Sequence, residues 1–202
     1  MPKVTLEYGQ QQRERIIEGS AEAFARGSYR LTTIDEIAEK LKLSKGAIYL
    51  YFKSKEELFA AVFETFIERR VSEIKQVCSG NEGVFRKLEA VLDQFVAMLS
   101  NKDYIFCRIW LESYLEGPRI PALQSLKNTS QQQFYQAVYA LLAEGQQQGA
   151  IKAELDIVSI TKVMLATCDG LILNAMTEEE GSDPQAVRRA MWNTFYNLLK
   201  TE

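Results

Sequence analysis

Histidine is absent from the 202-residue sequence. Without it, the chain cannot build a Ser-His-Asp or Cys-His catalytic site, an HExxH zinc site or an imidazole-based pH switch. The sequence also lacks a GxGxxG or Walker-type phosphate-binding loop, and its carboxylates do not cluster as a catalytic pair would. We therefore expect no active site, no metal and no cofactor. An enzyme built on this chain is an alternative without positive support.

Cysteine is scarce, with three residues that are widely separated and form no CxxC pair. The N-terminal segment MPKVTLEYGQQQRER lacks the apolar core of a secretory signal. Both observations predict a soluble, cytoplasmic protein with reduced, partly buried thiols. The alternative is a redox-sensing role for one of Cys78, Cys107 and Cys168.

Glycine and proline are also scarce, at 11 and 4 residues, and no strand-like alternation of useful length occurs. This composition predicts an all-α fold of about nine helices joined by short turns. We expect the first nine residues to form a loose arm and Gly27 to end the first helix. The expected helices are 10–26, 34–41, 44–51, 54–78, 84–100, 103–115, 120–148, 156–177 and 183–200.

The most apolar window, residues 157–176, is nearly long enough to span a membrane, but Lys162 and Asp169 interrupt it. Charged side chains are costly inside a bilayer. We therefore expect a buried or interface helix here and no membrane partner.

Charge is unevenly distributed along the chain, whose formal net charge is −3. Residues 1–60 carry 10 basic and 9 acidic side chains, whereas residues 61–202 carry 14 and 18. Between residues 27 and 55 the balance is 6 basic to 3 acidic. A local, modest basic excess suits a small DNA-contacting region on an acidic body.

The basic excess falls in residues 32–55, TTIDEIAEKLKLSKGAIYLYFKSK. Apolar residues at spacings of three and four predict a first short helix, and Thr33 with Glu36 has capping-box spacing. Ser44 is a good N-cap for a second short helix that carries Ile48 inward. Two short helices joined by about three residues have the dimensions of a helix-turn-helix. Three small helices around a core, with no partner, are the alternative.

That alternative does not explain the outer face of the second helix, which carries Lys45, Gly46, Ala47, Tyr49 and Tyr51. Small residues at a helix start allow close approach to DNA, and a helix N-terminus favours phosphate. Tyrosine hydroxyls can donate to phosphate oxygens, and the nearby lysines can neutralise them. We therefore predict a DNA-binding face.

Residue by residue, this segment resembles the DNA-binding domain of the tetracycline-repressor (TetR-like) family of transcriptional regulators, over about residues 10–60. Lys42 departs from the family pattern, which commonly has glycine in the turn. The resemblance implies a DNA-binding domain at residues 1–55 and an effector-binding and dimerisation domain at residues 56–202. It also implies that the helix from Ser54 to Cys78 transmits the signal between them. The matching positions are Ala23, Phe24, Gly27, Tyr29, Leu31 to Ile34, Ile37, Ala38, Leu43 to Gly46, Ile48, Tyr49, Tyr51, Phe52, Ser54 to Glu56 and Leu58.

The resemblance also implies roles for individual residues. The start of the recognition helix would face bases and nearby phosphates, and other residues would hold the DNA backbone. Lys45 is the side chain best able to read a guanine edge, although a phosphate contact is an equal alternative. The predicted DNA-binding set is Thr33, Ser44, Lys45, Gly46, Ala47, Tyr49, Tyr51, Lys53 and Lys55.

The middle helices are rich in aromatic residues, and such stripes pack in a core more often than they line a ligand site. Buried tyrosine and tryptophan nevertheless need polar partners, and an apolar cavity with a few polar groups is typical of a small-molecule pocket. We predict a hydrophobic or aromatic effector in a pocket formed by Phe66, Phe95, Phe106, Trp110, Tyr114, Phe134 and Met164.

The last two expected helices carry apolar and small residues on faces that need burial. We predict that these faces form a homodimer, because a helix-turn-helix protein normally contacts two half-sites of its operator. Packing within one subunit is the alternative. The predicted dimer interface is Val163, Ala166, Thr167, Gly170, Val187, Met191, Thr194, Phe195 and Leu198.

These features predict a sequence-specific, homodimeric transcriptional regulator of a pseudo-palindromic DNA operator. A repressor released by its ligand is favoured. The alternatives are an activator or a regulator that no ligand controls, and a small-molecule-binding module with weak DNA binding.

Overall fold

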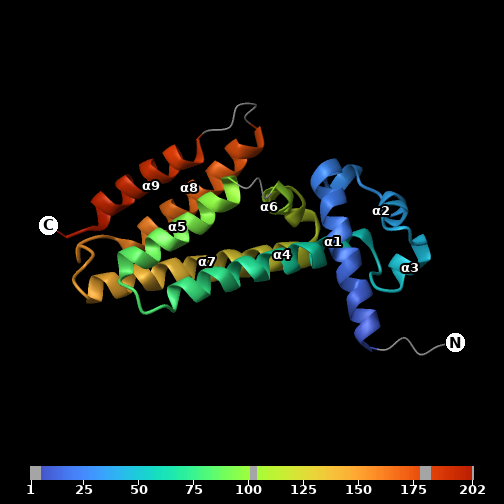
Figure 1. Ribbon diagram of the computed structural model, residues 1–202, viewed down its shortest axis with the longest axis horizontal. Helices are drawn as coiled ribbons and strands as arrows, with labels where there is room; N and C mark the ends of the chain where they lie inside the picture. The colour runs from blue at the N-terminus through green and yellow to red at the C-terminus, as the bar shows by residue number, and fades with distance from the viewer. Residues whose placement is uncertain (1–5, 101–103, 178–182, 202) are drawn as a thin grey trace. The chain divides into compact units, whose positions relative to one another are not determined.

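The computed structural model describes residues 6–100, 104–177 and 183–201, and these residues fold into nine α-helices and one short 3-10 helix (Figure 1). Within these ranges the only β-type pairing is an isolated bridge between Ile151 and Lys200, which confirms the all-α prediction. The expected turns at residues 101–102 and 178–182, and the start of a helix at 103, lie outside the described residues. The elements are α1 Leu6–Leu31, α2 Ile34–Leu41, α3 Lys45–Tyr49, α4 Lys55–Cys78, α5 Val84–Ser100, α6 Tyr104–Glu116, η1 Gly117–Arg119, α7 Pro121–Gln147, α8 Ile157–Thr177 and α9 Pro184–Leu199.

The chain divides into two compact units. The first unit comprises Met1–Ile67 and Ile105–Asn128, and the second comprises Glu68–Tyr104 and Thr129–Glu202. Helices α4 and α7 therefore contribute residues to both units, as does α6 through its first residue, Tyr104. The division at residue 55 between DNA-binding and effector-binding domains stays a prediction.

Helices α2 and α3 form because both of their N-termini are capped by side chains. Thr33 accepts a hydrogen bond from the Glu36 N–H at 3.2 Å, and the Glu36 carboxylate accepts from the Thr33 N–H at 2.7 Å. Ser44 Oγ accepts from the Ala47 N–H at 3.1 Å and begins α3. These caps confirm the predicted helix-turn-helix, although α3 is shorter than the expected 44–51.

The turn between α2 and α3 uses a left-handed residue. Lys42 has φ 56° and ψ 43°, so it adopts the conformation that glycine would adopt more readily. The Leu43 N–H donates to the Ala38 carbonyl at 2.9 Å, and Arg15 of α1 donates to the Leu41 carbonyl at 2.9 Å. These bonds satisfy the end of α2 and hold the turn against α1.

The three N-terminal helices enclose a small core. Phe24, Ile37, Ile48 and Phe52 are at most 1% exposed, as the sequence predicts. Helices α1 and α2 approach so closely at Gly19 that a Cβ there would lie 2.3 Å from a Leu41 methyl carbon. Burial of these side chains is the main stabilising term for helices too short to persist alone.

The expected boundaries of the first helix were wrong at both ends. Helix α1 already includes residues 6–9, and its break falls at Ser28, with φ 64° and ψ 160°, rather than at Gly27. Gly27 is needed for space instead, because a Cβ there would lie 2.8 Å from the Thr32 hydroxyl oxygen. That hydroxyl donates to the Ser28 carbonyl at 2.7 Å and closes the kink.

The core of the second unit joins α5, α7, α8 and α9. Apolar side chains from these helices, and from the loops before α8, pack together at 8% exposure or less. Buried Lys87 of α5 pairs with Glu144 of α7 at 3.2 Å. The core residues are Val84, Leu88, Leu141, Leu142, Ile151, Ile157 and Leu199.

Candidate nucleic-acid interface

The N-terminus of α3 presents small and basic groups to solvent. Ser44, Lys45 and Gly46 are exposed, and Ala47 is half-buried. The structure thus brings the four residues predicted to open the recognition helix onto one accessible end. Free N–H groups at such an end favour an anion such as a phosphate.

Gly46 is not required by the fold. Its φ is not in the left-handed region, and the nearest atom to a Cβ at this position would be Ser44 Oγ at 3.9 Å. Alanine would therefore fit and would favour the helix. A glycine that the fold does not need, at an exposed helix start, is consistent with close approach by a partner.

Lys45 is held by an exposed ion pair. Its ammonium lies 2.8 Å from the Asp35 carboxylate of α2, and this hydrogen bond raises the pKa of Lys45. The pair joins two helices across the turn, but both side chains are more than half exposed. Exposed pairs contribute little to stability, so a phosphate or base could replace Asp35 as the partner of Lys45.

Two neighbouring tyrosines and an exposed leucine continue this surface. Tyr49 is 43% exposed, Tyr51 is half-buried, and Lys53 is exposed, so all three predicted residues are accessible. Leu50, at 83% exposure, was not identified from the sequence. Its exposure could have been predicted, because Leu50 does not follow the three-and-four spacing of the buried residues.

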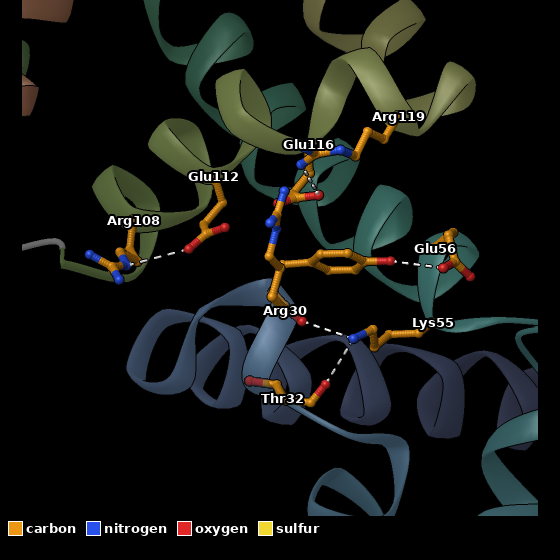
Figure 2. A network of polar contacts seen from close by, with 9 residues as sticks. Arg30, Thr32, Lys55, Glu56, Arg108, Glu112, Glu116 and Arg119 are labelled. Carbon is orange, nitrogen blue, oxygen red and sulfur yellow. Dashed lines mark hydrogen bonds and ion pairs between the residues drawn. The ribbon is translucent and has the colours of Figure 1, made fainter.

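Lys55 and Thr33 are already engaged within the protein. The Lys55 ammonium donates to the Tyr29 and Thr32 carbonyls at 3.0 and 3.1 Å, and Figure 2 shows it pointing at the end of α1. Thr33 contributes both its hydroxyl and its N–H to the capping box. Lys55 thus closes the carbonyl end of α1 onto the start of α4, and its contact with DNA stays a prediction.

The end of α1 is also bound by α6, which sequence reasoning did not identify. Arg30 Nε lies 2.6 Å from a carboxylate oxygen of Glu116, whose side chain is 5% exposed (Figure 2). Glu112 accepts a hydrogen bond from the Tyr29 N–H, and burial raises the pKa of Glu112. The Tyr29 hydroxyl donates to Glu56 at 2.9 Å. Residues 29 and 30 therefore connect α6 to the start of α4.

The residues predicted to form the effector pocket do not all belong to one unit. Phe66, Phe106, Trp110 and Tyr114 belong to the first unit. There Trp110 stacks on Phe106, at 6.1 Å between ring centroids, and meets Tyr114 edge-on at 5.8 Å. The second unit contains the remaining three predicted pocket residues, Phe95, Phe134 and Met164.

The second unit contains an apolar cavity of about 70 Å³. Helices α5, α8 and α9 supply most of its walls, and Phe95 and Met164 are the two predicted pocket residues among them. Met191 and Phe195, predicted for the dimer interface, also line it. Met191 is only 9% exposed, so it offers little surface to a partner subunit.

Most of the other predicted interface residues are accessible. Ala166, Gly170 and Thr194 are exposed, Val163 is 57% exposed and Leu198 is 42% exposed, whereas Thr167 and Val187 are half-buried. Within the described ranges, α8 is also the one helix whose length and composition would allow it to cross a membrane. An apolar helix this exposed needs a covering surface.

The three thiols form no disulfide. Burial raises the pKa of Cys168 to about 12 and also raises that of Cys78, which disfavours the reactive thiolate. In the parts of the chain that the structure describes, no group of three or more His, Cys, Asp or Glu side chains is arranged to hold a metal ion.

Two family models match this sequence. Residues 16–62 match the model of the bacterial regulatory proteins of the tetR family. Residues 86–199 match the C-terminal region of the BetI-type transcriptional repressors. The two matches include the helix-turn-helix and more than half of the chain.

Individual relatives agree with these matches. The uncharacterized HTH-type transcriptional regulator YfiR of Bacillus subtilis (strain 168) is 26% identical over 183 residues, which cover 90% of this chain and 89% of that protein. A TetR transcriptional regulator from Chloroflexus aurantiacus J-10-FL has a TM-score of 0.86 at 22% identity, covering 98% of this chain and 100% of the other. FadR from Bacillus subtilis, solved in complex with stearoyl-CoA, has a TM-score of 0.78 at 21% identity over 92% and 98%. At these identities the two structures show a shared fold.

Proposed function

Because the chain belongs to the TetR family of bacterial regulatory proteins, we propose that it is a cytoplasmic, homodimeric repressor that leaves its operator when a small hydrophobic ligand binds. The chain is a DNA-binding transcriptional regulator of the helix-turn-helix type. Repression is favoured because the model matching residues 86–199 describes transcriptional repressors. An activator is the second candidate, since the HTH-type transcriptional activator FasR of Mycolicibacterium smegmatis is 25% identical over 112 residues.

The open start of α3 carries this proposal. Gly46 has no structural requirement, and Lys45 extends from the same turn in an exposed, exchangeable ion pair. We place Ser44 to Ala47 against base edges and the adjacent phosphates in the major groove, with Lys45 exchanging Asp35 for a guanine or a phosphate. Tyr49 and Lys53 would hold the DNA backbone.

We add Leu50 to the proposed contact surface as an apolar side chain that would contact a base. An exposed aliphatic side chain beside a recognition helix can pack on the methyl group of thymine. We assign Thr33 and Lys55 chiefly to positioning, because their polar groups already fix the starts of α2 and α4. DNA binding is thus assigned to residues 1–55, and effector binding and dimerisation to residues 56–202.

For the effector, we propose an apolar molecule bound by the helical body. The FadR structure with stearoyl-CoA supports an apolar chain as one ligand class. The cavity of about 70 Å³ is smaller than ligand pockets, which usually hold roughly 300–1,000 Å³, so binding would require helices to move apart. Such a rearrangement is how ligand binding could shift the spacing of two recognition helices.

The proposal is tested by selecting bound duplexes from a random DNA pool and measuring affinity for the selected sequence. We expect a pseudo-palindrome with half-sites about one helical turn apart, or a multiple of that distance. The selected duplex should bind about 1,000-fold more tightly than its scrambled version near physiological salt. Equal affinity for the selected and scrambled duplexes would remove the proposal of a specific regulator.

A further inference from the structure

Lys42, in the turn of the helix-turn-helix, is a residue whose type the fold does not require. It ends α2 in the left-handed conformation, with φ 56° and ψ 43°. A non-glycine residue is strained in this conformation, whereas glycine adopts it readily. The Lys42 N–H donates to the Glu39 carbonyl at 3.0 Å, and glycine would make the same backbone bond. The turn would therefore form at least as well with glycine at this position.

The Lys42 side chain is also the uncommitted cation of this segment. Lys40 of α2 pairs with Glu22 of α1 at 2.7 Å. Lys45 of α3 pairs with Asp35 at 2.8 Å. Lys42 is exposed, and within the described residues its ammonium has no hydrogen bond or ion pair. Of the three lysines in α2, α3 and the turn between them, Lys42 is thus the one whose charge no protein group engages.

The helix dipole does not account for this lysine either. A cation near the carboxyl end of a helix is stabilising, because the carbonyl groups there are partly negative. Lys40 already lies in the last turn of α2, and Arg15 of α1 donates to the Leu41 carbonyl at 2.9 Å. The end of α2 therefore has two basic residues beside it, and a third is not needed to satisfy it.

We propose that Lys42 contacts a phosphate of the DNA backbone next to α3, and that this contact is the role of a lysine at a strained position. Lys42 is two residues before Ser44, which begins α3, so its exposed side chain lies beside the surface that the proposed function places against DNA. A lysine carries a point charge on a long, flexible stem, which suits a phosphate oxygen. The inference rests on the proposed function and adds one backbone contact to it.

The test measures binding of the full-length protein to the selected operator duplex and to its scrambled version, by fluorescence anisotropy. Lys42→Met is the decisive variant, because it removes the charge but keeps a non-glycine side chain of similar length in the turn. Loss of one phosphate contact should lower the affinity for both duplexes about 5- to 10-fold at 100 mM salt and reduce the salt slope by about 1. The defect should therefore shrink about threefold between 50 and 200 mM salt.

Two further substitutions at the same position separate the charge from the backbone strain. Lys42→Gly should lose affinity by the same factor, although its Tm rises by about 1–4 °C because glycine relieves the strain. A purely structural role would change stability and affinity in the same direction. Lys42→Arg should keep the affinity, the salt slope and the Tm of the wild type.

Lys40→Met is the matched control, since it removes the same charge two residues away from a side chain that faces α1. Its affinity and salt slope should equal those of the wild type. Wild-type affinity and slope in a folded Lys42→Met, or an equal loss in Lys40→Met, would overturn the inference. If the wild type discriminates the two duplexes and Lys42→Met has no effect, the Lys42 contact alone is refuted. A wild type that binds both duplexes equally refutes the proposed specific regulator, and one that binds neither refutes both.

Discussion

At the scale of single residues, two positions with a positive φ are not glycine, and two glycines in the same region do not have a positive φ. Lys42 and Ser28 are the non-glycine residues with positive φ among those described. Lys42 ends α2, and Ser28 forms the break inside α1. Gly27 and Gly46 do not have positive φ values. Gly27 makes room for the Thr32 hydroxyl, whereas a Cβ at Gly46 would meet no close neighbour. Residue type alone therefore assigned the left-handed break to the wrong position in α1.

Lys42→Gly should stabilise the DNA-binding domain. The left-handed conformation costs a non-glycine residue about 1–2 kcal/mol, part of which is offset by the greater freedom of glycine in the unfolded chain. We expect a gain of roughly 0.5–1 kcal/mol in unfolding free energy, or about 1–4 °C in Tm, measured by thermal denaturation. Lys40→Gly, inside α2, should instead lower stability by about 1 kcal/mol. A destabilised Lys42→Gly would contradict the described turn.

Gly46→Ala should weaken operator binding without lowering the stability of the protein. Alanine is accommodated without a clash, since its Cβ would make only an ordinary van der Waals contact with Ser44 Oγ, and it favours a helix by about 0.5–1 kcal/mol, so Tm should not fall. A methyl group between α3 and the groove should weaken operator binding about tenfold or more, because displacing the helix loses its contacts.

The control for this variant is Gly83→Ala, which also adds a methyl group without a clash but lies in the second unit. Its operator affinity should equal that of wild type. If Gly46→Ala binds the operator equally well, the start of α3 does not approach DNA closely.

Site interactions between residues close in the sequence could be predicted, whereas interactions between residues far apart in the sequence could not. The caps at Thr33 and Ser44 were predicted because each cap and its partner lie three residues apart. The engagement of Lys55 was missed because its carbonyl partners lie 23 and 26 residues away. A long-range partner of a lysine has no signature in local sequence.

At the scale of elements, the end of α1 connects the helix-turn-helix to α6 within the first unit. Arg30 pairs with Glu116 across a kinked turn (Figure 2). From the same turn, the Tyr29 hydroxyl donates to Glu56, and the Tyr29 N–H donates to Glu112. Helix periodicity predicted most helix ranges to within a few residues, since each buried face repeats along its own helix. It could not predict which helix packs on which.

Arg30→Met should loosen this connection. It removes the 2.6 Å pair and leaves buried Glu116 with the longer 3.6 Å contact to Arg119. Because Arg30 is itself 58% exposed, we expect a loss of only about 1 kcal/mol, with faster amide exchange in residues 29–32 measured by mass spectrometry. Arg26→Met, at an exposed position of α1, should change neither quantity. Unchanged exchange in Arg30→Met would show that the pair does not hold the turn.

At the scale of the whole molecule, a regulator of this family needs a partner copy, because TetR-family regulators bind operators and act as dimers. The sequence located the apolar surface on the last two helices but not which side chains their own subunit buries. Met191 and Phe195 line the cavity of the second unit, while Val163 and Leu198 are exposed. The same spacing of apolar residues fits both environments, so only packing decides between them.

Val163→Glu should disrupt the proposed dimer. A carboxylate buried at an interface between apolar helices is desolvated without a partner, which should raise the dimer dissociation constant by about 100-fold or more. Light scattering after size-exclusion chromatography should show a folded monomer at micromolar concentration. Leu31→Glu, at a 76% exposed apolar position of the first unit, should remain dimeric. A dimeric Val163→Glu would exclude this part of α8 from the interface.

The most direct test of sequence-specific recognition by α3 compares Lys45→Ala with Lys53→Ala on the selected operator and its scrambled version, between 50 and 200 mM salt. Lys53→Ala should weaken both duplexes equally and reduce the salt slope by about 1, as expected for loss of one phosphate contact. Lys45→Ala should lower the ratio of operator to scrambled affinity by about tenfold. An unchanged ratio for Lys45→Ala, or a wild type that does not discriminate the two duplexes, would contradict recognition through this helix.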